Sequence, residues 1–236
     1  MPIRPEEMDV ETHAEDPYPD VTAAGGLVAA LRQTAEARGR DIGLSPYVTE
    51  AVGMESRRGY LSVDTASGER LFRLRTSIPD FGWYIGGTDD LGTLVDAIAA
   101  WREDVPLDAL KARFDFLDLD EFTRALASGE PTSSQWAHLL SSEYYRPQRN
   151  LLRRLHADEV LRNAFPTMTH RAVRLRVDPM DYTSRQALVE ETDEGRYSTV
   201  TVGAPGATWT EVPDEQLIAY LRTALHENRL QCEKRR

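Results

Sequence analysis

The chain has 236 residues and a formal net charge of −11, with 41% hydrophobic and 28% charged residues. This composition is ordinary for a globular protein that buries a core, in one large domain or two small ones. The longest apolar runs are far short of the roughly 18 to 20 residues that span a bilayer, and the N-terminal stretch lacks the apolar segment of a signal peptide. We therefore predict a cytoplasmic protein with no membrane partner. The acidic balance also argues against a nucleic-acid partner, because binding the phosphate backbone needs a basic face.

Both ends of the chain are predicted to be tails. Residues 1–21 hold seven acids and several prolines against Arg4 as the one basic residue, a composition typical of a solvated, disordered segment. Residues 231–236 are predicted as a short second tail. They contain the single cysteine, Cys232, which therefore has no partner for an internal disulfide.

Residues 22–103 are predicted to form a first α+β half. Thr22 can cap a helix that runs to about Arg38, and Gly39 is placed to end it. The hydrophobic period then changes to two, which indicates strands. The predicted strands are Tyr47–Met54, Gly59–Asp64, Arg70–Thr76 and Gly82–Gly87, with turns at 66–69 and 78–80. Thr88 is predicted to cap a second helix, whose apolar stripe is Leu91, Leu94, Val95, Ile98 and Trp101.

Residues 104–146 are predicted as a helical connector, with helices starting at Pro106, near Leu119 and at a Ser134 cap. A second α+β half is predicted over 147–230. Its first helix starts at Pro147 and ends before Phe165-Pro166, because proline cannot continue a helix. Its strands are predicted at Ala172–Val177, Gln186–Glu191 and Tyr197–Val202, and a last helix opens at 213–215 with Leu217, Ile218, Leu221 and Leu225 on one face.

The order helix, meander, helix thus occurs twice. The predicted fold is α+β, with two helix / antiparallel meander / helix pseudo-repeats joined by a helical connector. The prediction concerns element order only, since no residue-level identity between the halves supports it.

The five histidines do not share a helix face at metal-ligand spacing, and no HExxH or paired CxxC occurs. We therefore predict no metal and no cofactor. His138 and His156 lie on amphipathic helices, where a surface or boundary position is the ordinary one. The paired acids Asp118/Asp120 and Glu190/Glu191 are not assigned to acid–base chemistry, because neighbours in sequence need not converge with shifted pKa values.

His170 is the one histidine that merits a functional hypothesis. It is expected to follow a turn at 167–169 and to precede a strand, where its imidazole could bond a backbone carbonyl or face a pocket as a ligand or catalytic group. Arg174 and Arg176 lie on one face of that strand. They could face solvent and pair with the many acids, or they could grip an anion or carboxylate. His170, Arg174 and Arg176 are the candidate ligand-binding residues, and His170 is the candidate catalytic residue.

Several short motifs together resemble an actinobacterial family of natural product biosynthesis proteins, the domain of unknown function numbered 6193. The resemblance covers about residues 57 to 226. It rests on Gly87-Thr88-Asp89-Asp90-Leu91, Ala97 to Trp101, Pro106-Leu107 to Phe116, Trp136, Leu161-Arg162-Asn163-Ala164-Phe165-Pro166 and Thr169-His170. It implies an association with specialised-metabolite gene clusters. It carries no reaction, cofactor or catalytic residue.

Three functions are compatible with these observations. The first is a non-catalytic binding or accessory protein of a biosynthetic or self-protection pathway, which recognises a partner protein, peptide or metabolite. The second is a cofactor-independent pathway enzyme with a site centred on His170. The third is an acidic immunity protein that neutralises a basic toxin. The sequence does not define the ligand or the oligomeric state.

Overall fold

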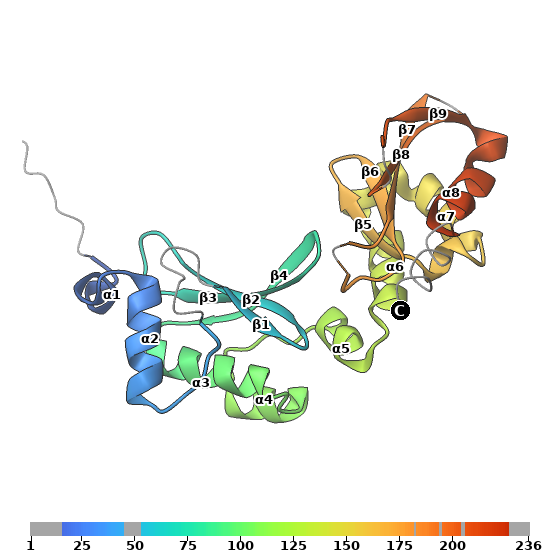
Figure 1. The fold of residues 1–236 in the computed structure, drawn as a ribbon. Helices are drawn as coiled ribbons and strands as arrows, with labels where there is room; N and C mark the ends of the chain where they lie inside the picture. The colour runs from blue at the N-terminus through green and yellow to red at the C-terminus, as the bar shows by residue number, and fades with distance from the viewer. Residues whose placement is uncertain (1–15, 45–52, 182, 194, 204–205, 227–236) are drawn as a thin grey trace, which may run out of the picture.

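The structure is a computed structural model that describes residues 16–44, 53–181, 183–193, 195–203 and 206–226. It is an α+β protein with two antiparallel sheets, one of four strands and one of five, each packed by helices. The two sheets lie in separate halves with short helices between them (Figure 1). The predicted fold class is therefore confirmed.

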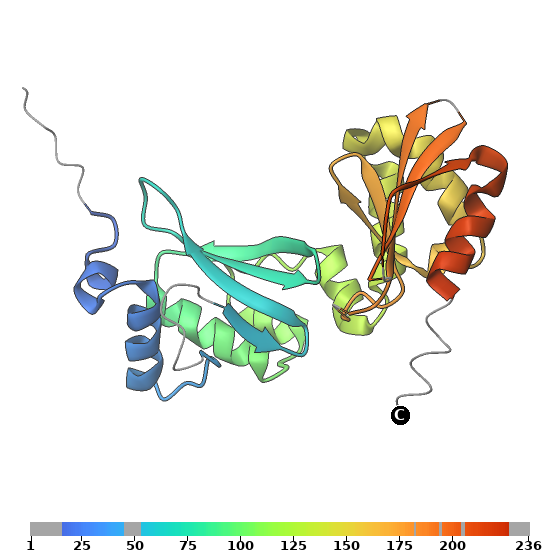
Figure 2. The ribbon, with the colours of Figure 1, turned by 45° about the horizontal axis from the view of Figure 1, so that its top comes forward.

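The first half contains a four-stranded meander in the order β1-β2-β3-β4. The helix α3 runs along one face of this sheet (Figure 2). The strand β3 shows why: its alternate residues Phe72, Leu74, Thr76 and Ile78 are buried, because a period of two places them all on the helix-covered face. The elements are α1 (Pro19–Ala24), α2 (Leu27–Ala37), β1 (Gly53–Ser56), β2 (Gly59–Thr65), β3 (Phe72–Ile78), β4 (Phe81–Thr88), α3 (Leu91–Arg102) and α4 (Leu107–Arg113).

The start of this half differs from the prediction. The single helix expected from Thr22 to Arg38 is two helices, because Gly25 and Gly26 adopt positive φ values of 90° and 116° that end the first one. Residues 16–21 of the expected tail belong to the fold. The Tyr18 hydroxyl lies 2.9 Å from the carbonyl oxygens of Ala66 and Glu69 and so anchors α1 to the β2–β3 hairpin. Residues 1–15 and most of the strand expected at Tyr47–Met54 lie outside the described residues.

The cap of α3 also differs from the prediction. Asp90, not Thr88, is the N-cap residue, and its carboxylate accepts a hydrogen bond from the Thr93 backbone N–H at 2.5 Å. That hydrogen bond holds the pKa of Asp90 below its usual value. The predicted apolar stripe of α3 is buried from Leu91 to Trp101.

The helical connector is divided between the two cores. Leu110 of α4 packs in the first core, while Trp136 and Leu139 of α6 pack in the second. α6 begins at Pro131, so Ser134 lies inside the helix and does not cap it. The connector elements after α4 are α5 (Glu121–Ser128), α6 (Pro131–Ser141) and the 3₁₀ helix η1 (Glu143–Gln148), which contains Pro147.

The second half is a five-stranded meander in the order β5-β6-β7-β8-β9. Leucines of α7 and α8 pack with Val173, Leu175 and Val189 of the sheet to form its core. The elements are α7 (Arg149–Ala157), η2 (Leu161–Asn163), β5 (Phe165–Thr169), β6 (Ala172–Arg176), β7 (Gln186–Asp193), β8 (Arg196–Val202), β9 (Thr210–Pro213), η3 (Asp214–Gln216) and α8 (Leu217–His226).

Two strands of this sheet were not predicted. Phe165-Pro166 ends the preceding helical segment, but it also opens β5, and the turn expected at 167–169 is the rest of that strand. Proline is tolerated there because β5 is an edge strand, so its missing N–H breaks no inner ladder. The other strand is β9, whose Pro213 pairs with Arg196 of β8. Residues 227–236, including the predicted C-terminal tail, lie outside the described residues.

Candidate functional site

His170 lies in a two-residue loop between β5 and β6, where Thr169 pairs with Ala172. It is exposed, and its φ of 58° places it in the left-handed region, which histidine adopts more readily than most residues. The hairpin loop therefore explains its position without a ligand. His170 lies at the opposite end of β6 from Arg176, so the structure does not gather these two residues into one site.

Arg174 and Arg176 do share a face, and they hold a carboxylate of the same chain. Both guanidinium groups pair with Asp80 in the loop between β3 and β4, and Arg176 Nη1 also donates to the Pro79 carbonyl at 2.9 Å. Arg176 is only 2% exposed. The arginines thus pair with an acid of the chain itself, which was the alternative to a ligand grip, and this pairing joins the two halves of the molecule; we call these three side chains the Asp80 clasp.

A groove of about 540 Å³ opens beside the clasp, between β4, α5 and α6. The groove lies at the junction of the two halves, and binding sites commonly form at such junctions. Its volume falls within the range of small-molecule sites. We call it the junction groove. Its lining is Phe81, Trp83, Asp120, Glu121, Phe122, Ser134, Gln135, Ala137, His138 and Ser141.

Aromatic rings of β4 and α5 form one wall of the junction groove. Trp83 and Phe122 meet edge to face with their centroids 4.7 Å apart, and Phe81 meets Phe122 in the same way at 5.2 Å. Phe165 of β5 continues this stack, with its centroid 6.2 Å from that of Phe81. Because each ring is held by its neighbours, the wall is preformed, and a ligand would lose little free energy in ordering it.

A chain of hydrogen bonds fixes the acidic end of the groove. The Trp83 indole N–H donates to the Thr123 hydroxyl at 2.9 Å, and that hydroxyl donates to Asp120 Oδ1 at 2.6 Å. The Thr123 backbone N–H donates to the same oxygen at 2.8 Å, which makes Asp120 the N-cap of α5. Asp120 Oδ2 makes no hydrogen bond within the described residues, so it is available to a ligand.

Gln135 is the most unusual residue of the lining. The residue as a whole is 3% exposed, and no hydrogen bond of its side-chain amide is found within the described residues, but its amide atoms are not among the fully enclosed unpaired atoms and so keep contact with the groove. A ligand with polar atoms in the groove could form hydrogen bonds with this amide in place of solvent. The groove therefore holds an unused donor and acceptor beside its apolar wall.

No local pattern in the sequence indicates this site. Its lining comes from three elements, and sequence periodicity places Trp136 and Leu139 of α6 inward without indicating that Gln135 and His138 line a groove. His138 is exposed, as expected for a surface histidine, and its ring lies 6.4 Å from that of Tyr145. Asp120, left unassigned from the sequence, is a groove residue, whereas Asp118 is not part of the lining.

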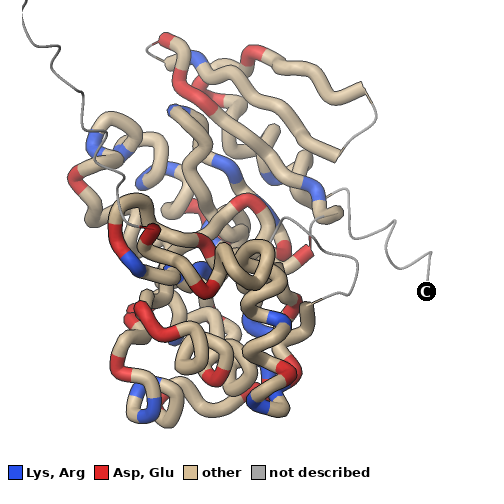
Figure 3. The backbone as a smooth tube through the Cα atoms, turned by 90° about the vertical axis from the view of Figure 1, so that its left-hand side faces the viewer, with Lys and Arg blue, Asp and Glu red and all other residues tan. Residues whose placement is uncertain are grey.

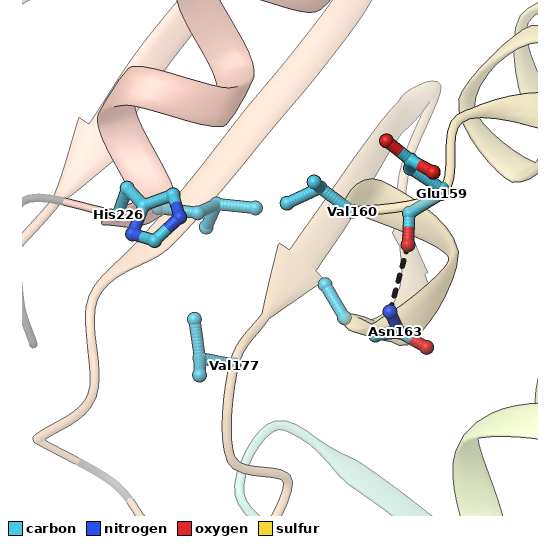
Figure 4. Close-up of a pocket in the computed structure, with 7 residues that line it drawn as sticks. Glu159, Val160, Asn163, Val177 and His226 are labelled. Atoms are coloured by element: carbon cyan, nitrogen blue, oxygen red, sulfur yellow. Dashed lines mark hydrogen bonds between the residues drawn. The ribbon is translucent and has the colours of Figure 1, made fainter.

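A second hollow, of about 300 Å³, lies between η2 and the end of α8 (Figure 4). Its wall is mostly aliphatic, from Val160, Ala164, Val177 and Leu225, with His226 facing Val160 across it. The Asn163 side-chain amide donates to the Glu159 carbonyl at 2.8 Å, so its N–H group is already used. This hollow offers apolar volume but fewer unpaired polar groups than the junction groove.

The position of η2 beside this hollow depends on Asp158. Its Oδ1 accepts hydrogen bonds from the backbone N–H groups of Val160 and Leu161, while its Oδ2 pairs with Arg222 of α8. The Arg222 guanidinium holds the pKa of Asp158 below its usual value, and the backbone N–H groups act in the same direction against desolvation. The pair therefore ties η2 to α8 as long as Asp158 is ionised.

Comparisons of the chain with protein-family models, curated proteins and solved structures give no significant match. The resemblance to the natural product biosynthesis family stays a prediction that rests on the motifs. In the described part of the chain, no group of three or more His, Cys, Asp or Glu side chains is placed to hold a metal ion. The helices of that part are all too short or too polar to cross a membrane.

Proposed function

We propose that this is a non-catalytic binding protein that holds a small organic ligand with an apolar body in the junction groove. The observation that carries the proposal is the Gln135 amide, which lines the groove without a partner in the described part of the chain, beside a preformed aromatic wall. Apolar contact with that wall supplies the driving force, and the polar groups of the lining select orientation. The ligand would bridge the two halves, since Trp83 lies on β4 and Gln135 on α6.

The biological setting of this function is proposed from the motif resemblance alone. It places the protein in an actinobacterial biosynthetic or self-protection pathway, where the ligand would be a pathway metabolite or the side chain of a partner peptide or protein. An enzyme centred on His170 gains no support from the geometry, because His170 is an exposed loop residue outside the junction groove. An acidic immunity protein remains an alternative proposal that only the net charge motivates.

Blocking the groove tests the proposal. Ala137 is an exposed residue of α6 that lines the groove, so Ala137→Trp should fill the groove without entering either core. The matched control is Ala109→Trp, at an exposed position of α4 away from the lining. The probes are three aromatic molecules of similar size: phenethylamine, 2-phenylethanol and 3-phenylpropanoate. Binding is followed by NMR through the Trp83 indole N–H, assigned with Trp83→Phe.

We expect at least one probe to shift the Trp83 signal in the wild type and in Ala109→Trp. The shift should be lost in Ala137→Trp. The proposal is overturned if no probe shifts this signal, or if Ala137→Trp responds like the wild type.

A further inference from the structure

We infer that the junction groove selects an organic cation, an amine that carries an aromatic or aliphatic body. The inference deepens the proposed function and rests on it. It starts from the charge of the lining, which holds the carboxylates of Asp120 and Glu121 and no lysine or arginine. An anion would meet repulsion there, whereas an ammonium group would meet opposite charge.

The acidic end of the groove can accept a hydrogen bond from a donor group of the ligand. Asp120 Oδ1 is occupied by Thr123, from both its hydroxyl and its backbone N–H. These bonds fix the carboxylate plane, so Oδ2 is held in place with its acceptor capacity unused in the described part of the chain. Glu121 follows directly and is exposed, which allows its side chain to reach the same ammonium group from the rim. A bond from an ammonium donor to a carboxylate is shorter and stronger than one between neutral groups.

The aromatic wall suits the rest of such a ligand. Trp83, Phe122 and Phe81 provide ring faces and edges in one stack. A cation near the face of a tryptophan or phenylalanine ring is attracted by its quadrupole, and an apolar body is desolvated by the same wall. An amine with an apolar body therefore uses both the acidic end and the wall, whereas a neutral analogue uses only the wall.

Gln135 is the independent observation that a ligand belongs here. The residue is 3% exposed and its amide has no partner within the described residues, so the amide oxygen, which keeps contact with the groove, can accept an N–H from the ligand. The lining holds no lysine or arginine, and its one histidine, His138, forms no hydrogen bond with that oxygen in the described part of the chain. Acids at one end, an amide acceptor and a ring wall together define an amine site rather than a general apolar hollow.

The test compares the same three probes on charge-neutral variants of the groove. Asp120→Asn keeps a side-chain oxygen that can cap α5, and Glu121→Gln changes an exposed residue, so the double variant should fold. The control is Asp118→Asn with Glu130→Gln, which removes two charges at exposed positions outside the lining. Glu121→Gln alone serves as a second variant if the double one is unstable.

In the wild type, phenethylamine should bind about tenfold more tightly than 2-phenylethanol, and 3-phenylpropanoate should bind most weakly. This preference should disappear in Asp120→Asn/Glu121→Gln and persist in the control variant. The affinity for phenethylamine should also fall as salt is added, while that for 2-phenylethanol should not.

Two failures are distinguishable. Equal binding of the three probes, blocked by Ala137→Trp, overturns the amine preference and leaves the binding function standing. A preference for phenethylamine that survives neutralisation of Asp120 and Glu121 also overturns the role of these two carboxylates and leaves the binding function standing. Loss of every response at Trp83 overturns the binding function and the amine preference together.

Discussion

The two halves share the order helix, meander, helix, yet a hairpin loop of each half lies in a different environment. Each has a two-residue hairpin loop with a non-glycine residue at a φ of 58°, Asp80 between β3 and β4 and His170 between β5 and β6. Asp80 is held by Arg174 and Arg176 of the other half, whereas His170 is exposed. A two-residue hairpin loop is thus a link between halves in one case and a surface feature in the other, and the positive φ falls on the second loop residue in the first case and on the first in the second.

The contact between the two halves is therefore asymmetric, because each half contributes a different structural element to it. The first half contributes a hairpin loop, and the second contributes the face of its sheet that carries Arg174 and Arg176. On the first sheet, the face away from the helices carries polar and aromatic groups, such as the exposed Tyr60 and Tyr84. Acidic and basic residues are interspersed over both halves (Figure 3). A repeat of element order therefore does not imply a repeat of interfaces.

The largest expected effect comes from matched deletions in the two cores. Leu94 in α3 and Leu221 in α8 are both 0% exposed and lie in the helix that follows each meander. Each change to alanine should cost about 3 kcal/mol, because a transfer term and a cavity term add. Urea denaturation with hydrogen exchange resolved by residue should show whether each loss extends to the other half.

If the halves unfold together, Leu94→Ala should lower protection in the second half as well. If they are independent, only the first half should respond. Val202→Ala, at a residue that is 38% exposed, is the control and should cost less than about 1 kcal/mol. A loss below about 1 kcal/mol for both leucines would contradict the two cores as described.

Most of the fold could be predicted because its signals are local. The alternation of Tyr197–Val202 and the stripe of α3 each depend on neighbours in sequence, and both elements form as predicted. The strand β5 was missed because Pro166 also stops a helix, and only its edge position shows why a strand accepts it. The break at Gly25 and Gly26 was missed because the apolar period continues across it.

The site could be predicted only in part. The shared face of Arg174 and Arg176 indicated a carboxylate grip, but its partner Asp80 lies more than 90 residues away, and no local pattern points to it. The groove depends on how α5 packs against α6 and on which side of α6 remains uncovered. Gln135 is one polar residue among several on that helix, and its burial arises from tertiary packing alone.

Removing the Asp80 clasp tests whether the asymmetric junction stabilises the molecule. Asp80→Asn keeps a residue type that tolerates positive φ but leaves the buried Arg176 without a carboxylate. Because Asp80 itself is 43% exposed while Arg176 is 2% exposed, the loss should be about 2 kcal/mol, mainly from leaving the Arg176 guanidinium buried without a carboxylate. The control is Asp64→Asn, whose pair with Arg73 on the first sheet is about 40% exposed on both sides and should cost less than about 1 kcal/mol. Equal losses in urea denaturation would contradict the buried clasp.

The smallest expected effect is the pH dependence of the stability that one ion pair contributes in each half. Asp158 pairs with Arg222 in the second half, and its side chain is 8% exposed. The pKa of Asp158 is lowered in the folded state, first by the hydrogen bond from Arg222. A carboxyl whose folded pKa is depressed contributes stability above its unfolded pKa of about 3.9, and that contribution is lost as the pH falls through the folded pKa.

Asp158→Asn should therefore cost about 1.5 kcal/mol at pH 7, with the loss of protection largest in η2 and α8. The difference from the wild type should shrink as the pH falls below about 4, because the wild-type carboxyl is then protonated as well. The matched variant is Asp96→Asn in the first half, where Arg38 lowers the pKa of Asp96 in the same way. It should show the same pH trend with its loss of protection centred on α2 and α3. A difference that is constant down to pH 2 would exclude the ion pair as its cause.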